Sequence, residues 1–152
     1  MSESPRKRKP KPATKVVLDT NILVSSLLVE EGNCATILKF VMRRKILVFY
    51  NADILDEYRR VLNYPTLAFE PHRIGTHLNL IFRKGLVMKS KKSTIKMIDE
   101  SDRVFYDLHK TAGAILITGN AKHYPPKEKS IMNPADFLSK QMGLKASIKR
   151  KK

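Results

Sequence analysis

The stretch VVLDTNILV, residues 16–24, decides the fold. Its first three residues are apolar and two of them are β-branched, which predicts a short buried strand over residues 15–19. A helix is expected from Thr20 to Val29, because apolar residues recur there at helical spacing. Asp19 therefore closes the strand, and its carboxylate is expected at the carboxyl end of that strand.

Apolar strands alternate with helices along the rest of the chain. ILVFY at 46–50 is apolar at every residue, which is typical of a strand buried on both faces. Further strands are expected at 86–88, 114–118 and 130–132, and helices at 33–44, 52–63, 71–83, 103–112 and 134–143. This alternation predicts an α/β protein whose central parallel sheet is covered by helices on both faces. In such sheets the functional site lies beyond the carboxyl ends of the strands.

Length and composition indicate one folded domain. The chain has 152 residues, of which 42% are hydrophobic, and this is enough for a modest core. A single cysteine, Cys34, excludes an internal disulfide framework and a multi-cysteine zinc site. The apolar runs are far shorter than the ~20 residues of a membrane span, and the N-terminus does not resemble a secretory signal. We therefore expect a cytoplasmic protein without membrane contact.

The positive charge is concentrated at the two ends of the chain. Thirty Lys and Arg face fourteen Asp and Glu, a formal net charge of +16. Residues 1–15 and 140–152 together hold twelve of the basic residues and one acid. We expect a disordered basic tail at 1–14, a folded domain at 15–141 and a basic C-terminal tail at 142–152. Such tails attract phosphodiester backbones, although tails that only aid solubility are the alternative.

Polar side chains follow several of the expected strands. Asp19 ends the first strand, Glu57 lies on the helix after the second, Asp102 starts a later helix, and Asn120 follows the strand at 114–118. In a parallel sheet these positions converge on one crevice. Carboxylates gathered there repel one another unless a divalent cation neutralises them, and oxygen ligands favour Mg²⁺ or Mn²⁺. With a basic surface, such a site suggests attack of water on a phosphodiester.

Five motifs resemble those of PIN domains, above all of the toxin components of prokaryotic type II toxin–antitoxin systems. They occur in the family's order: VLDTNILVS at 17–25, ILDEY at 54–58, DESDRVF at 99–105, ITGN at 117–120 and IMNPADFL at 131–138. Each motif is weak alone, but together they cover nearly all of the expected folded part.

The resemblance implies a Rossmann-like three-layer α/β/α fold and a metal-dependent endoribonuclease that hydrolyses RNA with a metal-activated water. Asp19, Glu57 and Asp102 match the family's metal-binding acids, with Mg²⁺ or Mn²⁺ as the cofactor. Asn120 departs from the family's fourth position, which is usually an aspartate; an amide supplies oxygen without charge. The resemblance also implies an antitoxin partner and a homodimer.

Neighbouring residues are candidates for supporting roles. We expect Thr20 and Asn21 to cap the first helix and orient Asp19, and Thr118 to contact a metal-bound water or a phosphate. Asp99 is the rival of Asp102 as the direct ligand, with Asp102 favoured about two to one. Candidates for contact with RNA are Lys122 and His123 near the site and the run Arg43, Arg44 and Lys45, which solvation explains equally well.

Other readings of these residues stay open. Asp19 and Asp102 are also ordinary helix caps, Glu57 is an ordinary solvated helix residue, and Asn120 an ordinary turn residue. An RNA-binding module with a degenerate, inactive site is the second hypothesis, and Asn120 is the feature that favours it. A phosphoacceptor receiver domain is disfavoured, because ILVFY at 46–50 does not end in an aspartate.

Overall fold

The structure is a computed structural model, and it describes residues 12–144. Five parallel strands form one sheet in the order β3-β2-β1-β4-β5, with the first strand at its centre. They are β1 (Thr14–Leu18), β2 (Ile46–Tyr50), β3 (Leu86–Val87), β4 (Ile115–Ile117) and β5 (Ile131–Met132). The parallel sheet predicted from the alternation of strands and helices is confirmed.

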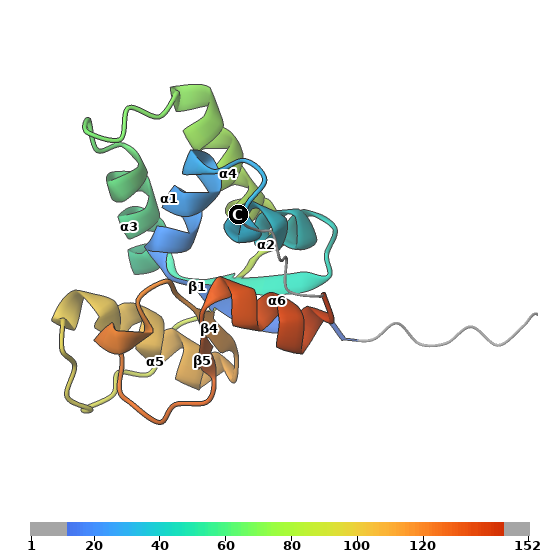
Figure 1. The fold of residues 1–152 in the computed structure, drawn as a ribbon. Helices are drawn as coiled ribbons and strands as arrows, with labels where there is room; N and C mark the ends of the chain where they lie inside the picture. The colour runs from blue at the N-terminus through green and yellow to red at the C-terminus, as the bar shows by residue number, and fades with distance from the viewer. Residues whose placement is uncertain (1–11, 145–152) are drawn as a thin grey trace, which may run out of the picture.

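Within residues 12–144, six α-helices cover this sheet. They are α1 (Thr20–Leu28), α2 (Asn33–Met42), α3 (Ala52–Leu62), α4 (Pro71–Lys84), α5 (Arg103–Ala112) and α6 (Pro134–Met142). Two 3₁₀ turns are added, η1 (Glu100–Asp102) and η2 (Ala121–His123). Helices α1 to α4 lie on one face of the sheet and α5 on the other, while α6 packs against α2 (Figure 1). The three-layer α/β/α architecture is therefore as predicted.

Local capping starts helices directly at the carboxyl end of the sheet. After β2, the Asn51 side chain accepts a hydrogen bond from the backbone N–H of Ile54 at 2.9 Å. After β5, the Asn133 side chain accepts from the N–H of Asp136 at 2.7 Å, and Pro134 occupies the first turn of α6. Short links of this kind hold the first turns of α3 and α6 close to the strand ends.

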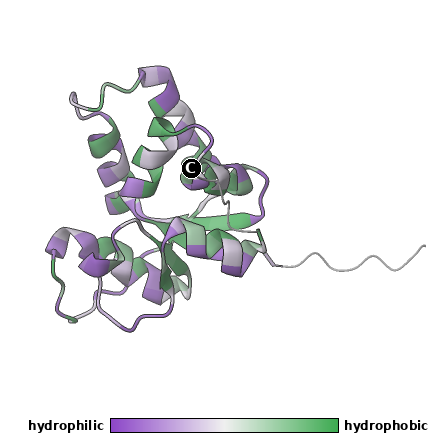
Figure 2. Ribbon diagram, viewed as in Figure 1, coloured by the Kyte–Doolittle hydropathy of each residue, from purple (hydrophilic) through white to green (hydrophobic). Residues whose placement is uncertain are grey.

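The core lies between the sheet and its helices. Val16, Val17 and Leu18 of β1 are fully buried, as are Leu116 and Ile117 of β4. Burial of each large apolar side chain is worth roughly 1.5–3 kcal/mol, so the central strands carry much of the stability. Figure 2 shows the apolar strands inside, with hydrophilic residues on the outer sides of the helices. Among the described residues, no helix has the length and apolar character needed to cross a bilayer.

Several predicted boundaries shift by a residue. The central strand ends at Leu18, so Asp19 is the N-cap residue of α1 and not the last strand residue. The ordered elements reach from Thr14 to Met142, one residue beyond the predicted domain of 15–141 at each end. Most of the two predicted tails, residues 1–11 and 145–152, lies outside the described residues.

Candidate active site

Asp19 sits at the carboxyl end of the central strand, where the chain turns into α1. Its side chain is almost buried, and the residue is 7% exposed. Two hydroxyl groups donate to the same oxygen, Oδ2: Thr118 Oγ1 at 2.8 Å and the Tyr124 phenol at 2.9 Å. Among the described residues no hydrogen bond reaches Oδ1. Hydrogen bonds thus fix Asp19 through Oδ2, while Oδ1 remains available as a ligand.

The residues that orient Asp19 differ from those expected. Thr20 and Asn21 make no hydrogen bond to Asp19, and α1 has no side-chain cap. Instead, Thr20 Oγ1 donates to Glu57 Oε2 at 2.8 Å, and Asn21 Oδ1 accepts from the backbone N–H of Gly119 at 3.0 Å. Both side chains point across to neighbouring elements, so they join α1 to α3 and to the turn after β4.

Thr118 also has another role than the one predicted. Its side chain is completely buried, donates to Asp19 and accepts from the backbone N–H of Asn120 at 3.0 Å. A hydroxyl engaged in this way supports the carboxylate and has no exposed surface to offer a phosphate.

Glu57 reaches the same end of the sheet from α3. Its side chain is 21% exposed, accepts from Thr20 and lies 3.6 Å from the Arg60 guanidinium. The next residue, Tyr58, is fully buried, and its phenol donates to the Leu18 carbonyl at 2.6 Å. Burial, together with the charges of Asp19 and Glu57, raises the pKa of Tyr58. The Tyr58 contact fixes α3 against the end of β1, and with it the position of Glu57.

Asp102 has fewer stabilising contacts than Asp19 and Glu57. Its side chain is 14% exposed, and the buried Oδ2 has no hydrogen-bond partner among the described residues. The His123 imidazole lies beside it, with Nδ1 at 3.5 Å from Oδ2. Burial, followed by the charges of Asp19 and Asp99, raises the pKa of Asp102 from 3.8 to about 6. The charge of the His123 ring opposes this shift without cancelling it.

Asp99, the alternative to Asp102 as the direct ligand, makes hydrogen bonds to Ser101 instead. Its Oδ1 accepts from the backbone N–H of Ser101 at 3.0 Å and from the Ser101 hydroxyl at 2.8 Å. These hydrogen bonds lower the pKa of Asp99, which is exposed. The contacts make Asp99 the cap of η1, and this geometry favours Asp102 as the acid that faces the other carboxylates.

Of the candidates for contact with RNA, only two lie near these acids. Lys122 and His123 form part of the exposed turn η2, directly after the exposed Asn120. Arg43, Arg44 and Lys45 come just before β2, so they lie at the opposite end of the parallel sheet. A five-residue strand, about 16 Å long, separates them from the level of Asp19, so they do not belong to this site.

No three His, Cys, Asp or Glu side chains within residues 12–144 are grouped closely enough to hold a metal as they stand. Asp19, Glu57 and Asp102 nevertheless share one electrostatic environment, since the charges of both other acids raise the pKa of Asp102. The partnerless oxygen of Asp102 and the all-oxygen donor set fit Mg²⁺ or Mn²⁺.

Sequence reasoning missed Tyr124. This residue is 2% exposed, and burial, then the charges of Asp19 and Asp102, raise its pKa far above the usual value. The signal was present in the sequence, because an aromatic residue with a hydroxyl follows the turn that carries Asn120. Only the folded chain shows that the hydroxyl meets Asp19, 105 positions earlier.

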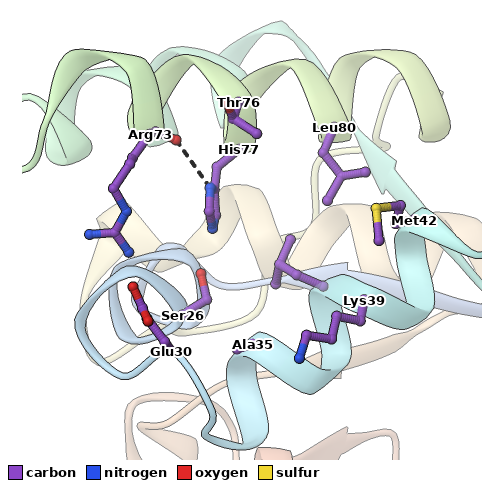
Figure 3. Close-up of a pocket in the computed structure, with 10 residues that line it drawn as sticks. Ser26, Glu30, Ala35, Lys39, Met42, Arg73, Thr76, His77 and Leu80 are labelled. Carbon is purple, nitrogen blue, oxygen red and sulfur yellow. Dashed lines mark hydrogen bonds between the residues drawn. The ribbon is translucent and has the colours of Figure 1, made fainter.

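A separate pocket of about 260 Å³ lies among α1, α2 and α4 (Figure 3). Its lining includes Arg73, His77 and Leu80 of α4, and none of the four predicted catalytic residues. The His77 ring faces the pocket, with its Nδ1 at 3.1 Å from the Arg73 carbonyl. Burial lowers the pKa of His77. His77 therefore belongs to the packing of α4 against α1 and α2.

Comparison with known proteins agrees with this arrangement. No curated protein sequence matches the chain. Among solved structures it is similar to the crystal structure of VapBC2 from Rickettsia felis bound to a DNA fragment from their promoter, with a TM-score of 0.54 and 15% identity. That similarity, which covers 79% of this chain and 97% of the other, concerns the fold. The sequence profile of the PIN domain matches residues 15–122, a range that contains all four predicted catalytic residues. Because the match spans most of the chain and the layers of the fold agree with it, the chain belongs to the PIN-domain family.

Proposed function

We propose that this protein is a metal-dependent endoribonuclease and the toxin of a toxin–antitoxin pair. The observation that carries the proposal is the buried, partnerless oxygen of Asp102 beside the charges of Asp19 and Glu57. Within residues 12–144 no lysine or arginine forms a salt bridge with Asp102, so a cation bound there would relieve the repulsion among the three acids.

The three acids would hold the ion through oxygens that accept no hydrogen bond within residues 12–144. Asp19 would bind through Oδ1, since Thr118 and Tyr124 occupy Oδ2. Asp102 would bind through Oδ2, and Glu57 through Oε1, since Thr20 occupies Oε2. When bound, Mg²⁺ or Mn²⁺ supplies a water of lowered pKa and stabilises negative charge on the phosphate in hydrolysis.

Other side chains near the acids would bind the phosphate and add an oxygen ligand. Lys122 and His123 are exposed next to Asp102 and would bind the phosphate that approaches the site. Asn120, on the turn between Thr118 and η2, would add a neutral amide oxygen where an acid is usual. The expected products carry 5′-phosphate and 3′-hydroxyl ends.

The assignment as a toxin draws on the fold likeness to VapBC2 and on the sequence motifs. By that likeness, the chain would pair with a cognate antitoxin and form a homodimer. RNA is proposed as the substrate because of the strong positive charge of +16, which suits a flexible polyanion, and because of the motifs.

A catalytically degenerate RNA-binding module is the second candidate. It is favoured by Asn120 and by the lack of any three ligating side chains already grouped for a metal within residues 12–144. Such a module would bind RNA equally well in EDTA and would cut none of it.

The test is cleavage of an end-labelled RNA by the parent and by Asp19→Asn, with Mn²⁺ and with EDTA. Asp56→Asn is the matched control, because Asp56 is exposed and pairs only with Arg59. We expect cleavage by the parent and the control in Mn²⁺, and none in EDTA or from Asp19→Asn. Metal-independent cleavage, or an active Asp19→Asn protein, contradicts the mechanism, and RNA binding without cleavage selects the degenerate module.

A further inference from the structure

The two ends of the parallel sheet differ in charge. The carboxyl ends of the strands carry the acids of the candidate site, whereas basic residues precede several strands. Eight of them form what we call the basic end: Arg43, Arg44, Lys45, Lys91, Lys92, Lys110, Lys127 and Lys129. All eight are exposed.

Strand order and hydrogen bonds bring these residues to the same end. The first three directly precede β2, and the last two precede β5, which runs parallel to it in the same sheet. Helix α5 leads into β4, and Lys110 lies in its last turn. The backbone N–H of Lys91 donates to Thr111 Oγ1 at 2.9 Å, which ties the segment with Lys91 and Lys92 to that turn. A hollow of about 540 Å³ there is bordered by Lys91, Lys92 and Lys110.

The charges of the basic end are mostly uncompensated. Among the described residues, Lys110 is the one member with a salt bridge, to Glu128 at 3.2 Å. The other seven therefore present their charge to solvent in the part of the chain that the structure describes. Exposed cations of which Lys110 alone is paired within the described residues suit a polyanion.

Backbone conformation supports a role for two of these side chains. Within residues 12–144, three non-glycine residues have positive φ, and two of them belong to the basic end: Arg44 at 61° and Lys127 at 73°. Glycine adopts this conformation without strain, so a large side chain is disfavoured there. Basic residues at both positions suggest that their charge is useful.

Both described ends of the chain also lie at the basic end. The start of β1 and the end of α6 are on the same side of the molecule as the turn before β2 (Figure 1). Residues 1–11 and 145–152, which continue from there, contain ten Lys and Arg and one acid. The sequence thus adds further positive charge to the chain where it joins this end.

We propose that the basic end is a binding surface for the sugar–phosphate backbone of RNA, separate from the catalytic end. The sheet is about 19 Å wide and its central strands about 16 Å long, so one RNA strand must pass around the molecule to occupy both ends. Evenly repeated phosphates match cations spread over such a width better than a short acidic peptide does. The choice of RNA as the polyanion rests on the proposed function. The existence of the basic surface does not, because it follows from the positions of the eight residues.

The experiment measures binding of a labelled single-stranded RNA of about 20 nucleotides, longer than most single-strand sites, to the full chain in EDTA over a range of salt concentrations. The test variant is Arg43→Gln/Arg44→Gln/Lys45→Gln. The control, Arg59→Gln/Lys89→Gln/Lys96→Gln, removes the same charge from exposed residues elsewhere. Because no cleavage is needed, failure here is distinguishable from failure of the proposed function.

We expect the test variant to lose about tenfold or more in affinity, and its slope of log K against log salt to fall by about 2. The control should lose clearly less. Arg44→Gly separates binding from folding, since it removes a charge and relieves the backbone: its melting temperature should not fall, while RNA binding weakens severalfold. Equal losses in test and control variants, or equally tight binding of a polyglutamate of the same length, would overturn the proposal.

Discussion

Among single residues, Asp19 is the central one, because its carboxylate accepts two hydrogen bonds at Oδ2 and none from the described residues at Oδ1. Thr118 and Tyr124 both donate to Asp19 Oδ2, and both are buried. Because burial and nearby acids raise the pKa of Tyr124, its phenol keeps its proton at neutral pH and remains a donor. Groups that orient a ligand in this way usually matter for metal affinity.

Replacement of Tyr124 by phenylalanine tests this role. Tyr124→Phe removes one of two hydrogen bonds to Asp19, so we expect Mn²⁺ affinity to fall about tenfold, the lower bound for such supporting groups. Mn²⁺ titration followed by electron paramagnetic resonance measures it. Tyr64→Phe is the control, because Tyr64 is exposed and its phenol accepts only from Arg60. Equal Mn²⁺ affinities for both variants and the parent would contradict the assigned role.

Asp102 should destabilise the metal-free protein. Its folded pKa of about 6 lies above the usual 3.8, so the folded state favours the protonated acid. The resulting loss of stability is absent below pH 4, grows as pH rises to 6 and stays constant above. We expect Asp102→Asn in EDTA to raise the free energy of unfolding at pH 8 by roughly 1 kcal/mol, after allowance for solvent screening.

Urea denaturation at pH 8 and pH 4 checks this expectation. Asp136→Asn serves as the control, since Asp136 is exposed on α6. An Asp102→Asn protein that is less stable than the parent at pH 8 would show that the carboxylate has a favourable partner after all.

At the scale of elements, side chains of α5 hold the segment that leads to Asp102. Arg103 donates to the Ser93 carbonyl at 3.0 Å and to the Ile95 carbonyl at 2.6 Å. Asp107 accepts from the backbone N–H of Ser93 at 3.2 Å. These contacts, one helical turn apart, fasten an otherwise irregular segment along α5. They fix the entry to η1 and so the place of Asp102.

His109 joins α5 to β5 and should make stability depend on pH. Its Nδ1 donates to the Tyr106 carbonyl at 2.6 Å, and Nε2 lies 3.0 Å from Ser130 Oγ. Burial lowers the pKa of His109, although the nearby Glu128 opposes this effect. The folded state thus favours the neutral ring, and stability should fall as pH drops below about 6.5, the value for an unfolded chain.

The pH effect is isolated by comparing variants. Urea denaturation at pH 7.5 and pH 5 should show a smaller loss for His109→Gln than for the parent, since the variant cannot titrate there. His72→Gln, which alters an exposed histidine, should behave as the parent. If the parent and His109→Gln lose the same stability between the two pH values, His109 does not cause the dependence.

Elements were easier to predict from the sequence than the contacts between them. Apolar runs such as ILVFY identify the strands, because burial on both faces requires apolar residues throughout. Parallel order then placed Asp19 and Asn120 at one end. The partners of Thr20 and Thr118 and the role of Tyr124 depended on side-chain directions across elements distant in sequence, which no local pattern encodes. Contact of Arg43 to Lys45 with RNA stays a prediction, and the sequence alone did not show that these residues lie at the opposite end of the sheet from the acids.

At the scale of the whole molecule, a bound ion should stabilise the fold. Asp19 before α1, Glu57 on α3 and Asp102 in η1 lie at the carboxyl end of the sheet. An ion bound by all three would link elements that separate on unfolding. A ligand at a hundredfold excess over its dissociation constant adds about 2.7 kcal/mol to the free energy of unfolding. We expect Mn²⁺ to raise the melting temperature of the parent by several degrees and that of Asp19→Asn much less. Equal increases in melting temperature for the parent and Asp19→Asn would mean that the ion binds at another site.

Anomalous diffraction from a crystal soaked in Mn²⁺ tests the central claim most directly. The claim is that oxygens of Asp19 and Asp102, brought together from two distant parts of the chain, bind one divalent ion. We predict an anomalous peak at a coordination distance of about 2.0–2.3 Å from Asp19 Oδ1 and Asp102 Oδ2, with Glu57 beside it. An ordered crystal with peaks only at other positions, or with none, would contradict the account.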